Sequence, residues 1–124
     1  MNFPAELKYT KSHEWIKMEA DGTAVVGISD FAQDELGDLV FINLPTEGDA
    51  VDCGAALCDV ESVKAVSDVL CPVTGVVTAV NDALLDAPEL LNEDPYGAWI
   101  AKLDQITATE ELLDAAEYEA FTKE

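Results

Sequence analysis

The sequence predicts a mostly β fold: a small sandwich of hairpins, with a short helix near residue 30 and helices at the C-terminal end. Segments of alternating apolar and polar residues lie on both sides of Lys64, and a period of two with β-branched residues is typical of half-buried strands. Asp21-Gly22 is a turn signal between two further apolar segments. With 124 residues, the chain has the length of one domain with a single core.

The N-terminal segment is predicted to form strands followed by one helix. Residues 7–18 form a short strand pair, and the Asp-Gly turn joins it to a strand at 23–28. Ser29 or Asp30 can cap a short helix, because both side chains accept hydrogen bonds from backbone N–H groups of a first helical turn. Gly37 is suited to ending that helix.

The middle of the chain leads into the lysine hairpin. Residues 38–44 are apolar and β-branched, which predicts a buried strand, and a turn follows at 45–49. Residues 51–55 are expected to form a short edge piece, with Gly54 at a tight bend. The strands around Lys64 come next.

The second half is predicted to return to the sheet and then to become helical. The expected elements are a strand at 72–80 broken at Thr74-Gly75, a loop at 81–97 and a last strand at 98–103. Thr107 and Glu110 have capping-box spacing. Residues 111–121 are then expected to form one or two helices, with any division near Ala115, and with four side chains available for packing: Leu112, Leu113, Ala116 and Tyr118.

Lys64 is predicted to occupy the exposed tip of a tight hairpin. The connection from Val63 to Val66 contains no Gly, Asn or Pro, so a type I turn is favoured over the primed turns that need positive φ. All six basic residues are lysines, against 26 acidic residues, and Glu61 and Asp68 flank the tip. One interpretation is an ordinary solvated lysine. The other is a covalent attachment point, because a primary amine can form an amide with a carboxylic acid cofactor such as lipoate or biotin.

Five blocks of sequence together point to a known family. They are YTKSHEW at 9–15, VGISDFAQDELGDLVFINLP at 26–45, EGDAVDCGAALCDVESVKAVSD at 47–68, PVTGVV at 72–77 and LNEDPYG at 91–97. In the same order, they resemble the signature blocks of the glycine cleavage system H protein family, over nearly the whole chain. The resemblance implies a small hybrid β-sandwich of the lipoyl/biotinyl-carrier type. In residues 95–99, PYGAW, the spacing between PYG and the tryptophan is one residue shorter than in the family pattern. This difference affects the expected shape of the loop and not the attachment site.

The resemblance also implies a site. It assigns lipoate to Lys64 through an amide, and it assigns recognition during lipoylation to Glu61. It places Ser12, Glu14 and Asp68 in a cleft that shields the loaded arm, where two carboxylates and a hydroxyl suit a cationic amine. The alternative for the segment around Ser12 and Glu14 is a plain strand edge, and for the two acids a solvated acidic face. No catalytic residue and no metal ligand is expected.

The function implied by the resemblance is that of a carrier. Such a protein shuttles the aminomethyl group of glycine from the decarboxylating glycine dehydrogenase, a pyridoxal phosphate enzyme, to the aminomethyltransferase. Dihydrolipoamide dehydrogenase then reoxidises the arm, which a lipoate-attaching enzyme has first installed. An alternative is a relay protein that donates lipoate to other enzymes without glycine cleavage.

Two other classes fit the sequence less well. A biotin carrier would have methionines beside its lysine, whereas the neighbours here are Val63 and Ala65. An enzyme is disfavoured because the chain has a single histidine, no nucleophile–base pair and no Gly-rich phosphate loop.

The net charge and the cysteine content limit which partners and which cellular compartment are expected. The formal net charge of −20 repels nucleic acids and anionic membranes, so neither is expected as a partner, and a monomer is expected. The start of the chain has no signal-peptide or transit-peptide pattern, which favours the cytoplasm.

The chain has three cysteines, Cys53, Cys58 and Cys71. Their odd number is typical of reduced thiols, and their spacing does not fit a zinc site. Cys58 and Cys71 are predicted to pack as small apolar residues in the sheet.

Overall fold

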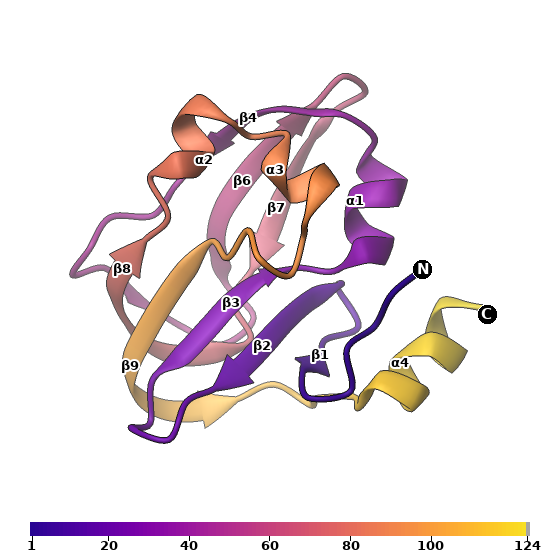
Figure 1. The fold of residues 1–124 in the computed structure, drawn as a ribbon. Helices are drawn as coiled ribbons and strands as arrows, with labels where there is room; N and C mark the ends of the chain where they lie inside the picture. The colour runs from indigo at the N-terminus through magenta and orange to yellow at the C-terminus, as the bar shows by residue number, and fades with distance from the viewer. Residues whose placement is uncertain (124) are drawn as a thin grey trace.

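The computed structural model describes residues 1–123, and in this part of the chain two antiparallel sheets are surrounded by four short helices (Figure 1). The six-stranded sheet has the order β1-β2-β3-β9-β8-β5, and the three-stranded sheet has the order β4-β6-β7. The mostly β prediction is therefore confirmed. The strands are β1 Lys8–Tyr9, β2 Glu14–Met18, β3 Ala24–Ile28, β4 Leu39–Asn43, β5 Ala50–Val51, β6 Ala56–Ser62, β7 Val66–Leu70, β8 Val73–Val80 and β9 Ala101–Thr109. The helices are α1 Asp30–Leu36, α2 Ala83–Asp86, α3 Leu90–Glu93 and α4 Ala115–Thr122.

The N-terminal strands form the pairs that the sequence predicts. β1 pairs with β2, and β2 pairs with β3 over its full length, both antiparallel. In the connecting turn, Gly22 has φ of +89°, a conformation that residues with a Cβ rarely adopt. The Asp21 carboxylate accepts a hydrogen bond from the N–H of Thr23 at 2.9 Å, which closes the turn.

Helix α1 begins and ends where its capping residues predict. The Ser29 hydroxyl accepts a hydrogen bond from the N–H of Ala32 at 3.1 Å, so the N-cap is Ser29. At the other end, Gly37 has φ of +80° and donates its N–H to the carbonyl of Gln33 at 3.0 Å. The seven-residue helix is thus fixed at both ends, and it forms one wall of the site described below.

Strand β4 is only half buried, which corrects the prediction of a buried strand. Leu39 and Ile42 are buried, whereas Val40 is 53% exposed and Phe41 42% exposed. The pairing of β4 with β6 shifts register between Leu39 and Phe41, so Val40 is an extra residue on β4. The outer face of the three-stranded sheet therefore carries apolar side chains in contact with solvent.

Strand β8 lies where it was predicted, whereas β9 starts later and runs further than predicted. β8 runs unbroken, and its predicted break at Thr74-Gly75 is instead a shift in the register of its pairing with β9. β9 begins at Ala101 and extends to Thr109, where it pairs with Val73. The predicted capping box starting at Thr107 is therefore wrong, because pairing with the end of β8 holds these residues in the sheet.

A single C-terminal helix, α4, follows β9 within the described residues. Its N-cap is Asp114, which accepts from the backbone N–H of Glu117 at 2.8 Å, while the Glu117 side chain accepts from the N–H of Asp114 at 3.0 Å. The capping box thus lies further along the chain than predicted. Of the side chains expected to pack, Leu113 and Tyr118 are buried, whereas Ala116 is exposed.

The segment at 81–97, predicted as a loop, contains the short helices α2 and α3. Leu84 and Leu91 are fully buried at their centres, which gives these helices their tertiary anchors. The Asn92 amide donates to the carbonyl of Gly37 at 2.9 Å and accepts from the N–H of Leu39 at 2.9 Å. α3 therefore holds the connection between α1 and β4 in place.

The loop that follows α3 is anchored to the N-terminal half. The indole N–H of Trp15 donates to the carbonyl of Pro95 at 3.0 Å. The hydroxyl of Tyr96 accepts from the N–H of Asp30 at 3.0 Å and donates to the carbonyl of Asn2 at 2.6 Å. In this short loop Tyr96 is a structural anchor.

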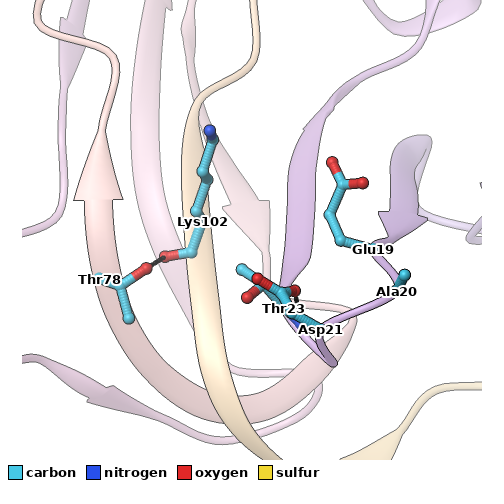
Figure 2. A pocket seen from close by; sticks show the side chains of 6 residues that line it. All are labelled: Glu19, Ala20, Asp21, Thr23, Thr78 and Lys102. Carbon is cyan, nitrogen blue, oxygen red and sulfur yellow. Dashed lines mark hydrogen bonds between the residues drawn. The ribbon is translucent and has the colours of Figure 1, made fainter.

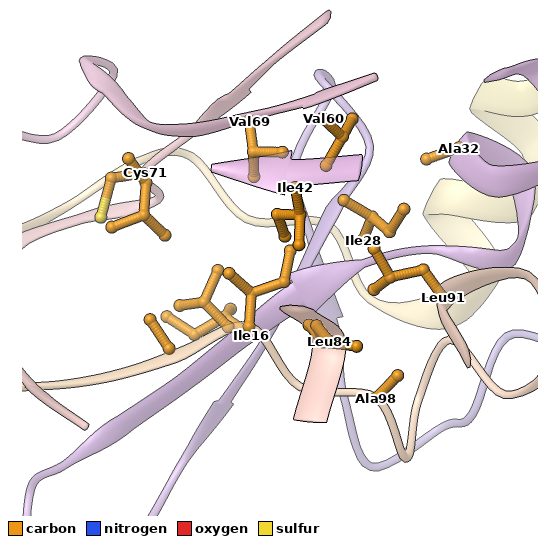
Figure 3. Close-up of a cluster of buried hydrophobic side chains, with 14 of the residues drawn as sticks. Ile16, Ile28, Ala32, Ile42, Val60, Val69, Cys71, Leu84, Leu91 and Ala98 are labelled. Carbon is orange, nitrogen blue, oxygen red and sulfur yellow. The ribbon is translucent and has the colours of Figure 1, made fainter. Parts of the chain in front are cut away.

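The main core lies between the two sheets (Figure 3). Ile16 of the larger sheet faces Ile42, Val60 and Val69 of the smaller one, and Leu84 of α2 closes the same cluster. Each side chain of this size contributes about 1.5–3 kcal/mol when it is fully buried. This cluster fixes the smaller sheet, and with it the lysine hairpin, against the body of the domain.

A second cluster packs α4 against the N-terminal strands. Tyr9 and Tyr118 are fully buried and their rings stack at 4.6 Å, with Phe3 edge-on to Tyr118 at 5.1 Å. Tyr9 also exchanges backbone hydrogen bonds with Leu113 at 2.9 and 2.7 Å. The C-terminal helix is therefore tied to β1 by both backbone and aromatic contacts.

Within residues 1–123, no helix is long and apolar enough to cross a membrane. The organisation as one domain, residues 1–124, with a core at about 23–103 and a tail at about 107–122, stays a prediction, and limited proteolysis would test it.

Candidate functional site

Lys64 lies at the exposed tip of the β6–β7 hairpin, and Ser62 closes the turn beneath it. The Ser62 N–H donates to the carbonyl of Ala65 at 2.8 Å, and the Ser62 hydroxyl oxygen accepts from the N–H groups of Lys64 at 3.1 Å and Ala65 at 3.2 Å. The Val63 N–H donates to the carbonyl of Asp38 at 3.0 Å. No residue of the turn has a positive φ, as expected for an unprimed turn. The backbone of the turn is thus fixed while the lysine side chain reaches into solvent.

The Lys64 side chain leans toward the C-terminal end of α1. Its ammonium group donates to the carbonyl of Glu35 at 3.4 Å, a weak contact with the end of the helix that attracts cations. A Cβ at Gly37 would lie 3.4 Å from the Lys64 Cε, an ordinary contact distance, so the side chain passes directly beside Gly37. The amine is therefore accessible and lies beside α1.

Glu61 lies on β6, in a row of side chains on the outer face of the smaller sheet. The strand registers place Phe41 of β4 opposite Glu61, and Val66 of β7 opposite Glu61 on the other side. Directly opposite residues of neighbouring strands point to the same face. The half-buried Glu61 carboxylate is thus flanked by two apolar side chains close to the lysine turn.

A cleft of about 200 Å³ lies between α1 and β7, with apolar walls contributed by β3, α1, β6 and β7. Its polar residues are Ser12, His13, Glu14, Glu35, Ser67 and Asp68. The fold therefore brings the three predicted cleft residues together from two distant parts of the chain. Because Lys64 contacts Glu35, the lysine lies at the mouth of this cleft.

Glu14 is the buried acid of the cleft, with 2% of its surface exposed. Its carboxylate accepts hydrogen bonds from the hydroxyls of Thr10 at 2.7 Å and Ser12 at 2.5 Å, and from the N–H of Leu70 at 3.4 Å. Burial raises the pKa of Glu14 to about 7, and these hydrogen bonds only partly oppose the shift. Near neutral pH the group is thus divided between its protonated and ionised forms.

Asp68 differs from Glu14, because it is exposed at the edge strand of the smaller sheet. Its neighbour directly opposite on β6 is Asp59, whose carboxylate accepts from the Asn43 amide at 2.6 Å. Like charges directly opposite one another repel. Asp68 can therefore hold a cation at the rim of the cleft, while Glu14 can do so inside.

Further residues, which were not predicted from the sequence, support the cleft. Thr10 is buried, and its hydroxyl both donates to the Glu14 carboxylate and accepts from the Glu14 N–H at 3.1 Å. His13 has φ of +76°, and its Nδ1 lies 2.8 Å from the hydroxyl of Tyr118, which lies 2.7 Å from the Ser29 hydroxyl. Burial lowers the pKa of His13, which favours the neutral imidazole. The unusual turn at 10–14 produces these contacts, and the periodicity of the sequence gives no signal for it.

The three cysteines are free thiols, and Cys53 contacts Pro72 and Thr74 at the start of β8. Cys71 is buried, but it lies between β7 and β8 and not within the sheet as predicted. Cys58 lies on β6, and burial raises the pKa of its thiol to about 12. In residues 1–123 no group of three His, Cys, Asp or Glu residues is placed to hold a metal ion.

A larger and shallower hollow, of about 560 Å³, lies by the β2–β3 turn (Figure 2). Its residues are Glu19, Ala20, Asp21, Thr23, Thr78 and Lys102. The Lys102 ammonium lies 4.9 Å from the centre of the Trp99 ring, and the Thr78 hydroxyl donates to the Lys102 carbonyl at 3.3 Å. None of its charged side chains is buried, so this hollow does not compete with the cleft as a candidate site.

A β-sandwich with an exposed lysine at the tip of one hairpin has the architecture of lipoyl-carrier domains. A solved structure with this fold, that of a glycine cleavage system H protein from Mycobacterium marinum, superposes with a TM-score of 0.92 at 41% sequence identity. The superposition covers 98% of this chain and 100% of that one.

The sequence comparisons give the particular family. The family model described as glycine cleavage H-protein matches residues 7–124. The glycine cleavage system H protein of Lachnoclostridium phytofermentans is 59% identical over 94% of this chain and 92% of its own length. Glycine cleavage system H protein 2 of Pseudomonas putida is 54% identical, and an Escherichia coli H protein is 52% identical, each over 99% of this chain and 98% of its own. The chain belongs to the glycine cleavage H-protein family.

Proposed function

We propose that this protein is the lipoyl carrier of a glycine cleavage system and that it holds lipoate as an amide on Lys64. The observation that carries the proposal is the exposed amine on a fixed hairpin tip, at the mouth of a cleft with apolar walls and a polar interior. The family supports the carrier role. Because the relatives named above are glycine cleavage proteins, they favour the carrier over a lipoate relay.

The residues of the site fit a lipoyl group. The lysine amine is free to be acylated, and the apolar walls of the cleft suit a hydrocarbon arm. When bound, lipoate supplies a disulfide whose sulfur can take up the aminomethyl group of glycine. Ser62 fixes the point of attachment, and the fold excludes water from the Glu14 carboxylate, which is 2% exposed.

The cleft residues would shield a cationic amine on the loaded arm. Glu14 offers a buried carboxylate inside the cleft, while the exposed Ser12 and Asp68 offer a hydroxyl and a second carboxylate at its rim. A charge-assisted hydrogen bond to a buried carboxylate is stronger than one in water, because less solvent competes for the cation. We assign recognition during lipoylation to Glu61, which lies three residues before Lys64.

The proposal includes a set of partners. The expected partners are a lipoate-attaching enzyme, the decarboxylating glycine dehydrogenase, the aminomethyltransferase and dihydrolipoamide dehydrogenase. A tethered group is presented to each enzyme at high local concentration and cannot diffuse away. The carrier acts as a monomer, and its three thiols suit a reducing compartment such as the cytoplasm.

The experiment is to incubate the protein with a lipoate-attaching enzyme, lipoate and ATP, and to map the added mass by peptide mass spectrometry. A lipoyl increment is expected on Lys64, none in Lys64→Arg, and a normal increment in the control Lys11→Arg, which alters another exposed lysine. Modification of Lys8, Lys11, Lys17, Lys102 or Lys123 in place of Lys64 would overturn the assignment. Fully lipoylated protein should then support glycine decarboxylation exchange, and no exchange would favour the relay.

A further inference from the structure

Exposed apolar side chains gather at the lysine end of the smaller sheet. Four of the large hydrophobic side chains that the described residues expose lie there: Val40 at 53%, Phe41 at 42%, Val63 at 67% and Val66 at 62%. We call these four residues the lysine-end patch. Scattered apolar residues on a surface are ordinary, whereas a group of them marks an interaction site.

The local structure of β4 builds this patch. The register shift between Leu39 and Phe41 inserts Val40 as an extra residue, and both Val40 and Phe41 are exposed as a result. The registers then align Phe41, Glu61 and Val66 in one row across the three strands. The patch is therefore an apolar surface with one carboxylate at its centre.

We propose that the lysine-end patch is the surface on which the lipoate-attaching enzyme docks to reach Lys64. This inference rests on the proposed function and assigns a partner to the same site. The partner surface would be apolar opposite Phe41 and Val66 and would place a Lys or Arg side chain opposite Glu61. Aromatic side chains such as Phe41 are enriched in the cores of interfaces, and a carboxylate that is covered there requires an opposite charge as its partner.

Among the expected partners, the lipoate-attaching enzyme is the one that forms a bond at the Lys64 nitrogen itself. The Lys64 amine, after losing a proton, attacks the acyl carbon of an activated lipoyl phosphoanhydride. A carbon–nitrogen bond forms, the acyl–oxygen bond breaks, the phosphate oxygen keeps the electron pair, and the nitrogen loses a second proton. The attaching enzyme must therefore bring its catalytic groups to the Lys64 nitrogen, next to Val63 and Val66. The other enzymes act at the far end of the arm and need not cover the turn.

The charges around the patch indicate a basic rim on the partner. Asp59 and Asp68 form a directly opposed pair on β6 and β7, two residues along each strand from the row that contains Glu61. The protein as a whole has a formal net charge of −20. An enzyme with lysine or arginine side chains around an apolar centre would thus be attracted at long range and oriented by Glu61.

The test compares lipoylation rates of surface variants by intact mass. The double variant Phe41→Thr/Val66→Thr removes the apolar row while keeping residues that favour strands. Met18→Thr is the matched control, because Met18 is 49% exposed at the far end of β2. Phe41→Leu keeps an apolar side chain in the patch. Thermal unfolding of each variant confirms that it is folded.

The double variant should lower kcat/KM for lipoylation about tenfold or more, with Met18→Thr unchanged and Phe41→Leu close to the parent protein. Once fully lipoylated, the double variant should support glycine decarboxylation exchange at the parent rate. Unchanged lipoylation of the double variant would overturn the docking surface and leave the carrier function standing. Loss of exchange in the lipoylated double variant would overturn the assignment to the attaching enzyme. A parent protein that takes no lipoate on Lys64 would overturn both proposals.

Discussion

The Lys64 turn and the Glu14 corner lie at the two ends of the candidate site, and they are built in opposite ways. Lys64 is exposed, and backbone and hydroxyl hydrogen bonds within a tight turn hold its position. Glu14 is 2% exposed and is held by Thr10, Ser12 and the N–H of Leu70, which comes from the other sheet. The turn is thus a local structure, whereas the corner exists only when the two sheets are assembled.

Because of this difference, substitutions in the two regions should affect function and stability differently. A change at the lysine tip should remove function with little effect on folding, because no buried contact is lost. A change at Glu14 should alter both, because a buried carboxylate that ionises destabilises the folded state while it serves as a cation acceptor. Variants in both regions test that separation.

The first prediction concerns the pH dependence of stability in Glu14→Gln. The folded-state pKa of Glu14 is raised from 4.5 to about 7, so the unfolded chain ionises first and the parent loses stability as the pH rises from 4.5 to 7. The glutamine side chain of the variant does not titrate. The free energy of unfolding of Glu14→Gln, relative to the parent, should therefore increase by about 2–3 kcal/mol between pH 5 and pH 8.

The measurement is urea unfolding of both proteins across this pH range. His13, whose pKa is lowered, titrates in both proteins and cancels in the difference. Glu61→Gln serves as a control on the smaller sheet. A difference between Glu14→Gln and parent that stays constant with pH would contradict the proposed cost of the buried charge.

The second prediction concerns shielding by the corner. Lipoylated protein is loaded with the aminomethyl group, the enzymes are removed, and ammonia release is followed with time. Glu14→Ala should release ammonia several-fold faster than the parent, which corresponds to about 1 kcal/mol in the barrier, because water gains access to the loaded carbon. Asp68→Ala should have a smaller effect, since Asp68 is already solvated. Equal rates in all three proteins would show that these carboxylates do not protect the group.

The third prediction concerns the turn. Ser62→Ala removes the hydroxyl that accepts from the N–H groups of Lys64 and Ala65, and it should lower stability by about 0.5–1 kcal/mol. Lipoylation should slow because the amine is less well positioned, while the pH dependence of stability should match the parent. A pH profile altered in the manner of Glu14→Gln would mean that the two regions are coupled.

The smallest effect is expected for Asp68→Asn. Removing one of two charges that lie directly opposite each other, Asp68 and Asp59, should stabilise the fold by a few tenths of a kcal/mol at low salt. The gain should shrink as sodium chloride screens the repulsion.

The parent protein should itself gain stability from low to moderate salt, because the acidic groups that give it a net charge of −20 repel one another. A melting temperature of the parent that stays flat or falls over this range would refute the repulsion argument.

The elements that the sequence predicted well depend on local chemistry. The Asp21-Gly22 turn, the Ser29 and Gly37 caps of α1 and the unprimed lysine turn each arise from residues within one turn of each other. Their hydrogen bonds form between near neighbours, so residue type alone indicates them. The resemblance to a known family added the identities of the candidate site residues.

Other features were decided by contacts between distant segments. β9 extends to Thr109, and so overrides a capping pattern, because β8 offers a partner strand. α2 and α3 form in a segment whose composition is typical of a loop, because the core takes up Leu84 and Leu91.

The exposed lysine at a hairpin tip follows from the sequence alone, since alternation and turn chemistry act over a few residues. The burial of Glu14 beside β7, with its pKa raised to about 7, and the exposure of Val40 and Phe41 arise only when the chain is folded. Burial depends on which surfaces meet when the two sheets pack, and that packing joins residues far apart in the chain.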